Sequence, residues 1–283
     1  FLRAASIDID QRKQQGKGRN VRVELKGIPI FFTPMISFPV GAARKSGFLF
    51  PSFGTSNKSG FEFGAPYYFN LAPNYDLTLT PQLLSRRGLG LEAQFRYLSE
   101  HSRGKIGSHF LPNDDLAGRD RSLSSLWHQT DFTDNLRLSA SIEHASDSQY
   151  FEDFGLGPDG TSVTFLDRYL SLAWLGRGWR FDGRVQDFQT IDVSVDPLSR
   201  PYSRLPQLEF TGAWPLAGSG LITSLDAEAT WFDRDVGTTG LRMDLMPQIA
   251  WPLRGPGYHL EPSAAYRMTS YRLSDLASGA DDA

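Results

Sequence analysis

The residues of this chain that could carry chemistry are few, and the first group is a set of carboxylates. Asp147, Glu152, Asp153 and Asp159 lie close together in a polar stretch. Carboxylate oxygens are the ligands that Ca²⁺ prefers, but these four lack the spacing of an EF-hand loop. A solvated acidic loop is the simpler interpretation, and it also fits the second acidic group, which comprises Asn113, Asp114, Asp115 and Asp120.

The remaining candidates for catalysis or metal binding show no supporting pattern. The five histidines include no pair four residues apart and no HExxH motif; they are His101, His109, His128, His144 and His259. GxSxG, P-loop and GxGxxG-helix motifs are also absent from the sequence. The lack of cysteine excludes thiolate metal sites and disulfides within this sequence. We therefore expect no enzyme activity, no metal and no cofactor.

Composition excludes two further classes of protein. Hydrophobic residues make up 40% of the 283 residues, and the mean hydropathy is −0.33. The longest uncharged run, residues 27–43, contains three prolines and is too short for a spanning helix, which needs about 20 apolar residues. The net charge of −3 provides no basic field that would favour nucleic acid.

The main signal along the chain is a period of two. In residues 89–97, Leu89, Leu91, Ala93, Phe95 and Tyr97 alternate with small, polar or charged residues, as in a strand with one apolar face. The same alternation occurs in residues 61–69, 75–82, 136–143, 225–231 and 241–251.

These segments favour an antiparallel transmembrane β-barrel. They run for about seven to eleven residues, close to what a tilted strand needs to cross a bilayer. Aromatic residues cluster near their ends, as in an interfacial girdle: Tyr97, Trp127, Trp174, Trp179, Trp214, Trp231, Trp251 and Tyr258. Short turns, as at 85–88, 176–178, 218–220 and 255–257, alternate with the longer polar links expected at 113–121 and 149–160.

A soluble all-β binding module also gives alternating strands and remains an alternative. It would place the charged face of each strand in water, whereas a barrel would place that face in a polar lumen. Residues 1–45 differ from the rest, with strands expected at 6–10 and 21–26 around a polar hairpin at 11–20. The ends of the sequence also resemble cuts in a longer chain, so we treat it as a fragment. Because about half a barrel leaves two open edges, we expect the fragment to be unstable alone in a bilayer.

Four stretches of the sequence together resemble one family. They are RKSGFLFPSFGTS (44–56), PYYFNLAPNYDLTLTPQLLSRRGLGLEAQFRYL (66–98), SDSQYFEDFG (146–155) and YSRLPQLEF (202–210). In this order they resemble the LptD (OstA) family of lipopolysaccharide-assembly proteins of the Gram-negative outer membrane. The resemblance runs through most of the chain, and the second stretch is the most specific.

The resemblance implies a fold, partners and a location. Residues 1–45 would be the last strands of a periplasmic β-jellyroll and the junction, and residues 46–283 the N-terminal part of the outer-membrane barrel, with about 12 strands. Lipopolysaccharide would arrive from the periplasmic bridge protein LptA through the jellyroll, and the lipoprotein LptE would fill the barrel lumen. The implied function is insertion of lipopolysaccharide into the outer leaflet through a lateral gate near the first barrel strands. A general diffusion porin or receptor-type barrel is the alternative.

Two prolines are the candidate gate residues. Pro51 lies in the run 48–53 and Pro66 in the run 61–69. Because proline cannot donate to a strand ladder, it belongs at edges, bulges or strand starts. The family has gate prolines at what we take to be these positions, and each missing hydrogen bond would lower the cost of opening by about 1 kcal/mol. The alternative is that both prolines only bend strands or mark turns.

Other residues complete the predicted site. Phe48, Phe50 and Phe53 would form the apolar exit beside the prolines. Arg44 and Lys45, and also Arg86 and Arg87, are candidates for contacts with lipid phosphates. Solvated turn charges are the alternative for all four.

Overall fold

The computed structural model describes residues 2–12, 15–25, 28–40, 44–155 and 162–275. Most of these residues lie in antiparallel strands, which confirms the all-β expectation. The described helices are α1 (Tyr150–Phe154) and the short 3₁₀ helix η1 (Pro197–Ser199). Across the described ranges, no helix is long and apolar enough to cross a membrane. The chain divides into two compact units, and β12 (Arg119–Thr133) contributes residues to both.

The first residues form a small sheet around the central strand β3 (Gln15–Leu25). That strand pairs on one edge with β4 and on the other with β2 and β1. The polar hairpin expected at 11–20 is shorter than predicted, because Gln15 to Arg19 already pair with β2. The strands of this sheet are β1 (Leu2–Arg3), β2 (Ser6–Asp10), β3 (Gln15–Leu25) and β4 (Ile28–Pro39).

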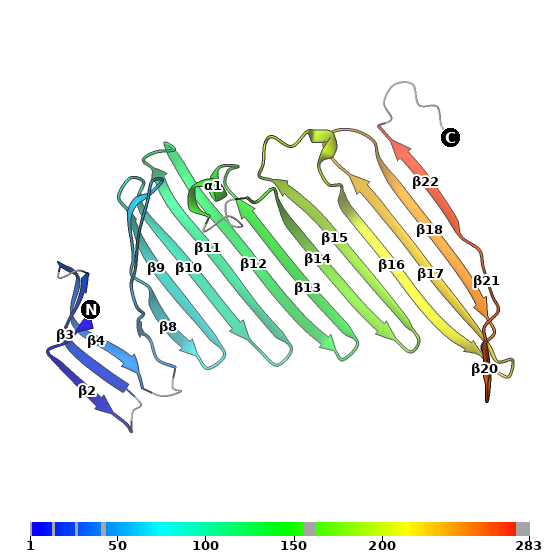
Figure 1. The fold of residues 1–283 in the computed structure, drawn as a ribbon, viewed down its shortest axis with the longest axis horizontal. Coiled ribbons are helices and arrows are strands. Elements are labelled where there is room, and N and C mark those ends of the chain that lie inside the picture. Colours follow the sequence, from blue (N-terminus) through cyan, green and yellow to red (C-terminus); the bar gives the residue numbers. More distant parts are fainter. Residues whose placement is uncertain (1, 13–14, 26–27, 41–43, 156–161, 276–283) are drawn as a thin grey trace. The chain divides into compact units, whose positions relative to one another are not determined.

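A second sheet begins at residue 47, and its first strands belong to the first unit. Two short strands in succession occupy each of the first two places in the order of this sheet, β5 and β6 in the first strand position and β7 and β8 in the second. β5 pairs with β8, and β6 pairs with β7. Both β7 and β8 then pair with β9, which is followed by β10 and β11 (Figure 1). The bounds are β5 (Gly47–Phe48), β6 (Ser52–Ser56), β7 (Gly60–Gly64), β8 (Tyr67–Ala72), β9 (Tyr75–Leu84), β10 (Gly88–Leu98) and β11 (Ser102–Asp114).

In the second unit, consecutive strands are hydrogen-bonded neighbours, as in an up-and-down meander (Figure 1). Here β22 and β21 both pair with β18, and β19 and β20 form a separate hairpin. The bounds are β13 (Leu136–Ala145), β14 (Phe165–Gly176), β15 (Trp179–Thr190), β16 (Ser203–Leu216), β17 (Leu221–Asp233), β18 (Thr239–Ala250), β19 (Leu253–Gly255), β20 (Tyr258–Leu260), β21 (Ser263–Ala265) and β22 (Met268–Ser274).

The strands are longer than the sequence pattern predicted. From β9 to β18 they hold 10 to 15 residues, because polar residues at the ends of the alternating segments also pair. The prediction of a long link at 113–121 was wrong, since β11 and β12 are joined by a tight turn at 115–118. In the second unit, two-residue turns such as 134–135 and 177–178 alternate with the longer connections 146–164 and 191–202.

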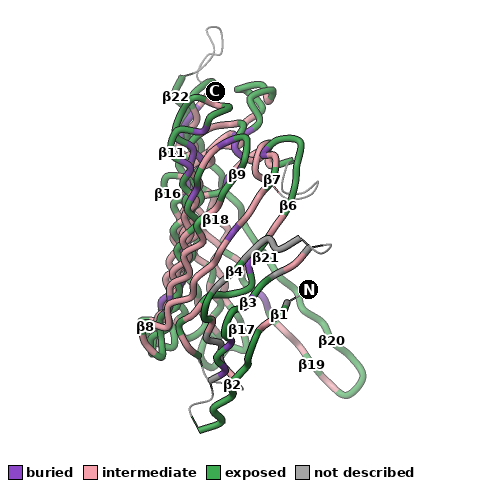
Figure 2. Tube along the Cα trace, turned by 90° about the vertical axis from the view of Figure 1, so that its left-hand side faces the viewer, coloured by how far each residue is buried: buried purple, intermediate pink, exposed green. Residues whose placement is uncertain are grey.

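The two faces of the second unit's sheet have opposite chemistry. Leu170 is opposite Val185 and Trp174 is opposite Phe181, whereas Ser171 is opposite Arg184. Trp174 remains 50% exposed and Leu170 43%, although both lie within a regular strand. Few residues of this single layer are buried (Figure 2). An extended apolar face of this kind marks a surface that contacts lipid or another protein.

Aromatic residues gather at the end of the second unit that has the short turns. The ring centroids of Trp174 and Trp179 are 5.2 Å apart, those of Trp179 and Phe210 are 5.9 Å apart, and those of Phe210 and Trp214 are 6.1 Å apart. Trp174, Trp179 and Trp214 lie at or near strand ends, as the sequence predicted, whereas Phe210 lies in the middle of β16. The prediction was wrong for Trp127, which lies in the middle of β12.

A buried ion cluster closes the turn between β11 and β12. The Asp114 carboxylate accepts a hydrogen bond of 2.6 Å from Arg87 Nη1 and lies 3.4 Å from Arg121 Nη1. The same carboxylate accepts hydrogen bonds from the backbone N–H groups of Leu116 and Ala117. All three charged side chains are at most 4% exposed, so the cluster binds β11, β12 and the turn before β10 together in a low-dielectric environment.

We predict that Asp114→Ala in the full-length protein destabilises the fold by about 3–5 kcal/mol, because it leaves two buried guanidinium groups without their shared carboxylate. The measurement is the urea midpoint of the detergent-solubilised protein, followed by heat-modifiable gel mobility. Asp115→Ala, at an exposed position of the same turn, is the matched control and should leave the midpoint unchanged. Equal midpoints for the two variants would contradict the structural role of the cluster.

Candidate functional site at the first strands

The two candidate gate prolines lie at the same level of neighbouring strands. Pro51 lies between β5 and β6, and Pro66 lies between β7 and β8. Phe48 pairs with Tyr67, and Ser52 pairs with Gly64. Three residues, 49–51, are therefore opposite two, 65–66, which is the geometry of a β-bulge. At this point the regular pairing stops in both strands, between Phe48 and Ser52 in the first and between Gly64 and Tyr67 in the second.

The hydrogen bonds at Pro66 show what the interruption removes. The Leu49 N–H donates to the Pro66 carbonyl at 2.9 Å. In an antiparallel ladder, two residues that are paired in this way exchange two such bonds. Pro66 has no N–H, so the return bond to Leu49 cannot form. The missing bond is on the side of Pro66 that faces the first strand position, not on the side that faces β9.

Aromatic side chains flank the interruption on both sides. Phe48 contacts Tyr67 edge to face with ring centroids 4.9 Å apart, and Phe53 stacks on Phe63 at 6.1 Å. Phe50 lies within the bulge and is 68% exposed. The structure thus places the three predicted phenylalanines along the same broken strand, with Phe48 and Phe53 packed against its partner and Phe50 projecting from it.

Arg44 is engaged with the strands that follow the gate. Its guanidinium donates to the Tyr68 hydroxyl at 2.9 Å and to the Pro73 carbonyl at 3.1 Å, and it forms an ion pair with Asp76. Arg96 donates to both oxygens of the same carboxylate, at 2.9 and 3.0 Å. The Asp76 side chain is only 4% exposed. This cluster, the Asp76 clasp, fixes the segment that enters the first strand, while Lys45 is half-buried beside Arg44.

The polar face of the second unit contains a hollow near the short turns. Its volume is about 610 Å³, and β12 to β16 line it. Ion pairs cross its floor, with Arg137 Nε 2.5 Å from Asp131 and Arg180 Nη2 2.7 Å from Asp182. This face presents many fixed charges and therefore suits a polar lumen or a polar partner.

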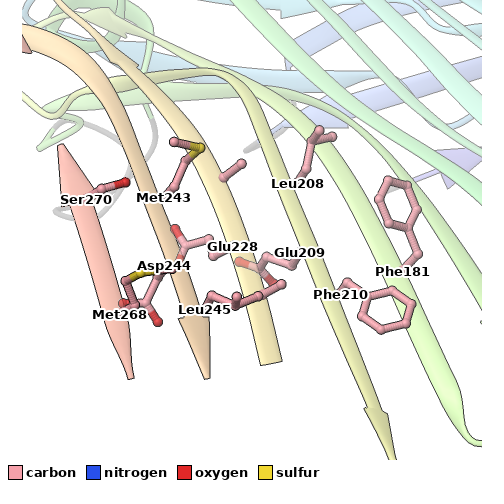
Figure 3. Close-up of a pocket in the computed structure, with 12 residues that line it drawn as sticks. Phe181, Leu208, Glu209, Phe210, Glu228, Met243, Asp244, Leu245, Met268 and Ser270 are labelled. Carbon is pink, nitrogen blue, oxygen red and sulfur yellow. The ribbon is translucent and has the colours of Figure 1, made fainter. Parts of the chain in front are cut away.

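The apolar face of the second unit has a shallower hollow of about 360 Å³ (Figure 3). It forms over β17 because Ala227 and Ala229 are small, whereas the neighbouring strands carry larger side chains. Those side chains include Phe210 of β16 and Met243 of β18. The hollow has the shape and polarity to accommodate hydrocarbon.

Two family models match the chain and together cover most of it. The model described as LptD protein matches residues 18–164, and the model described as LPS transport system D matches residues 119–283. The chain belongs to the LptD family. The resemblance seen in the sequence is therefore confirmed, and the four quoted stretches lie within or across the matched ranges.

Curated members of the LptD family align with nearly the whole chain. LPS-assembly protein LptD of Nitrosococcus oceani is 39% identical over 282 residues, which are 99% of this chain and 38% of that protein. The Alkalilimnicola ehrlichii protein is 38% identical, with 100% and 37% covered, and that of Bordetella pertussis is 36% identical, with 96% and 35% covered. The chain spans a little over a third of the length of these LptD proteins.

Of the acidic residues considered for metal binding, Asp147 serves local structure. Asp147 accepts hydrogen bonds from the Ser146 hydroxyl and the Gln149 N–H just before α1. Glu152 and Asp153 lie in the first turn of that helix. Asp159 lies outside the described residues. Within the described ranges, no three histidine or carboxylate side chains group closely enough to hold a metal ion.

Pro81 also belongs to this site, although the sequence did not predict it as a gate residue. Pro81 of β9 lies opposite Ala65, whose N–H donates to the Pro81 carbonyl at 3.1 Å. Pro81 had been counted only as one more apolar position in an alternating strand. The available signal was its spacing, because Pro51, Pro66 and Pro81 follow one another at fifteen-residue intervals.

We predict that Asp76→Ala in the full-length protein makes trypsin cleave after Arg44 and Lys45 roughly tenfold faster, because a charge-assisted hydrogen bond contributes about 1.5 kcal/mol. The rate is measured by timed digestion and mass spectrometry of the fragments. Glu92→Ala on β10 is the control, since Glu92 contacts Gln82 and not Arg44. The clasp would be disproved by equal cleavage rates in the two variants.

Proposed function

We propose that this chain forms part of a lipopolysaccharide-assembly protein of the outer membrane, and that lipopolysaccharide leaves it beside the first strands. The observation that carries the proposal is the interruption at Pro51 and Pro66, found in a chain of the LptD family. The names of the related proteins support the substrate class, and the interruption supports the proposed place of exit.

Weak pairing at this place has a direct energetic consequence. A strand pair inside a bilayer depends on its own hydrogen bonds, because lipid offers no replacement donors or acceptors. Each bond that is absent from the closed state is one that opening need not break, a saving of about 1 kcal/mol. The bulge and the missing Pro66 N–H therefore make this part of the sheet easier to open than the continuous ladder between β9 and β10.

The exposed aromatic residues support an exit for acyl chains. Phe48 is 43% exposed and Phe50 is 68% exposed, on the same strand as the interruption. Apolar side chains at this point stabilise hydrocarbon that passes from the interior to the bilayer. Arg44 and Lys45 remain candidates for transient phosphate contacts, although the Arg44 donors are engaged in the Asp76 clasp while the structure is closed.

The remaining parts of the chain take roles that follow from this proposal. Residues 1–45 form the end of a periplasmic jellyroll and the junction, through which lipopolysaccharide arrives from LptA. Residues 46–283 form the N-terminal part of the barrel, with the apolar face toward lipid and the charged face toward LptE in the lumen. Among the described residues β22 pairs only with β18, so closure of the barrel needs a further strand at that edge.

A photo-crosslinking amino acid at Phe48 or Phe50 of the full-length protein is predicted to trap lipopolysaccharide in cells. Both side chains are exposed at the interruption, so the reactive group would face the proposed exit. The adduct is detected as a slower band that reacts with antibody to lipopolysaccharide. Trp174, equally exposed in a regular strand, is the control position. If no position within residues 46–69 gives an adduct, the proposed exit is wrong.

Replacement of Pro66 by alanine is predicted to reduce export. Alanine restores the N–H that can donate to Leu49, and one added bond of about 1 kcal/mol makes opening roughly fivefold less frequent. Lipopolysaccharide at the cell surface is measured after depletion of the wild-type protein. Pro215→Ala in β16 is the control for loss of a strand proline. Normal export by Pro66→Ala would show that pairing at this position does not limit opening.

A further inference from the structure

Pro81 extends the interruption into a second ladder. Gly64 pairs with Gln82 and Tyr67 with Leu79, so the register of β9 runs unbroken from β7 into β8 and Ala65 lies opposite Pro81. The register shifts only farther along β8, between Phe69 and Ala72. The Ala65 N–H donates to the Pro81 carbonyl, and Pro81 has no N–H to return. A second bond is therefore missing, one residue away from the bond that is missing at Pro66.

The two absences lie on opposite sides of the same strand. Pro66 lacks the donor that would face Leu49, and Pro81 lacks the donor that would face Ala65. Beyond them the pairing is intact, because β9 and β10 pair without a register shift from Gly88 and Leu84 to Tyr97 and Tyr75. The weak zone therefore crosses two ladders and ends at β9.

Contacts on either side of this zone hold the first two strand positions in place. On one side, the Ser85 N–H donates to the Phe61 carbonyl at 2.9 Å, and the Arg86 N–H donates to the Ser59 carbonyl at 3.1 Å. On the other, the Asp76 clasp binds Arg44 and Tyr68 to β9. The weak zone lies between backbone pairs at one end and the Asp76 clasp at the other, where β8 and β9 also shift register between Phe69 and Ala72.

We propose that Pro81 is a positioning residue of the gate, and that Pro51, Pro66 and Pro81 form a hinge line about which residues 47–72 bend away from β9. This inference rests on the proposed function, because it concerns how the same exit opens. Strand pairing continues on both sides of Pro81, so the proline leaves the strand intact and removes one donor only. The first strands therefore open by bending in the middle rather than by unzipping from one end.

The first test measures backbone opening without reference to lipopolysaccharide. In the full-length protein in lipid nanodiscs, Pro81→Ala should slow amide hydrogen exchange in residues 47–72 roughly fivefold, the effect of one added backbone bond. Pro247→Ala is the matched control, because Pro247 of β18 likewise accepts from Tyr266 N–H at 3.1 Å and cannot return the bond. The hinge would be overturned if Pro81→Ala left exchange in residues 47–72 unchanged. It would also be overturned if Pro247→Ala slowed exchange in residues 47–72 as much as Pro81→Ala does.

The second test connects the hinge to export in cells. Lower surface lipopolysaccharide with Pro81→Ala, together with slower exchange, supports the role of Pro81 in the gate. Slower exchange with normal export overturns that role but leaves the exit itself standing, because adducts at Phe48 test the exit independently. Pro81→Val supplies the same N–H with a strand-favouring side chain, so it replaces Pro81→Ala if the alanine variant does not fold.

Discussion

The backbone hydrogen bond is the interaction on which this structure depends. The second sheet is a single layer, so no packed core compensates for pairing that is lost. Each inner strand is held by its two neighbours, and the long ladders from β9 to β18 provide most of that pairing. Wherever a strand lacks a donor, the loss is local and is not offset by side-chain packing. Proline thus has a larger effect here than it would have over a globular core.

The alternation of side chains follows from the same constraint. A single paired layer must satisfy a different environment on each face, and a period of two does so with every strand. Rows of directly opposed residues result, such as Trp174 and Phe181 on one face and Ala173 and Asp182 on the other. The charged residues of the second face offset one another in ion pairs, so that face remains polar without a large net charge.

Local pattern predicted the strands well, but not their partners. Residues 89–97 and 241–251 were identified as strands because alternation is a property of the sequence alone, and both lie within observed strands apart from Trp251. The link at 113–121 was misjudged, because the polar residues there pair and the Asp114 carboxylate closes the turn. Arg44 and Asp76 are 32 residues apart, and Pro81 meets Ala65 only through the register of β9, so neither pairing could be derived from the sequence. The fifteen-residue spacing of the prolines points to Pro81 itself but not to its partner.

If the proposed gate opens at the weak zone, the position of that zone would let the first strands open without coming apart. If the weak pairing lay at a turn, the first strand would fray from its end and expose unpaired groups along its whole length to lipid, which is costly. Here Ser59 and Phe61 accept backbone bonds from Arg86 and Ser85 in the turn that follows β9, and the opposite end is fixed by the buried Asp76 carboxylate. Bending between these two points would expose few new backbone groups to lipid, because the prolines and the bulge already leave some groups at this point without strand partners. In the proposed hinge, the same arrangement would return the strands to register on closing, because the contacts at both ends would not have separated.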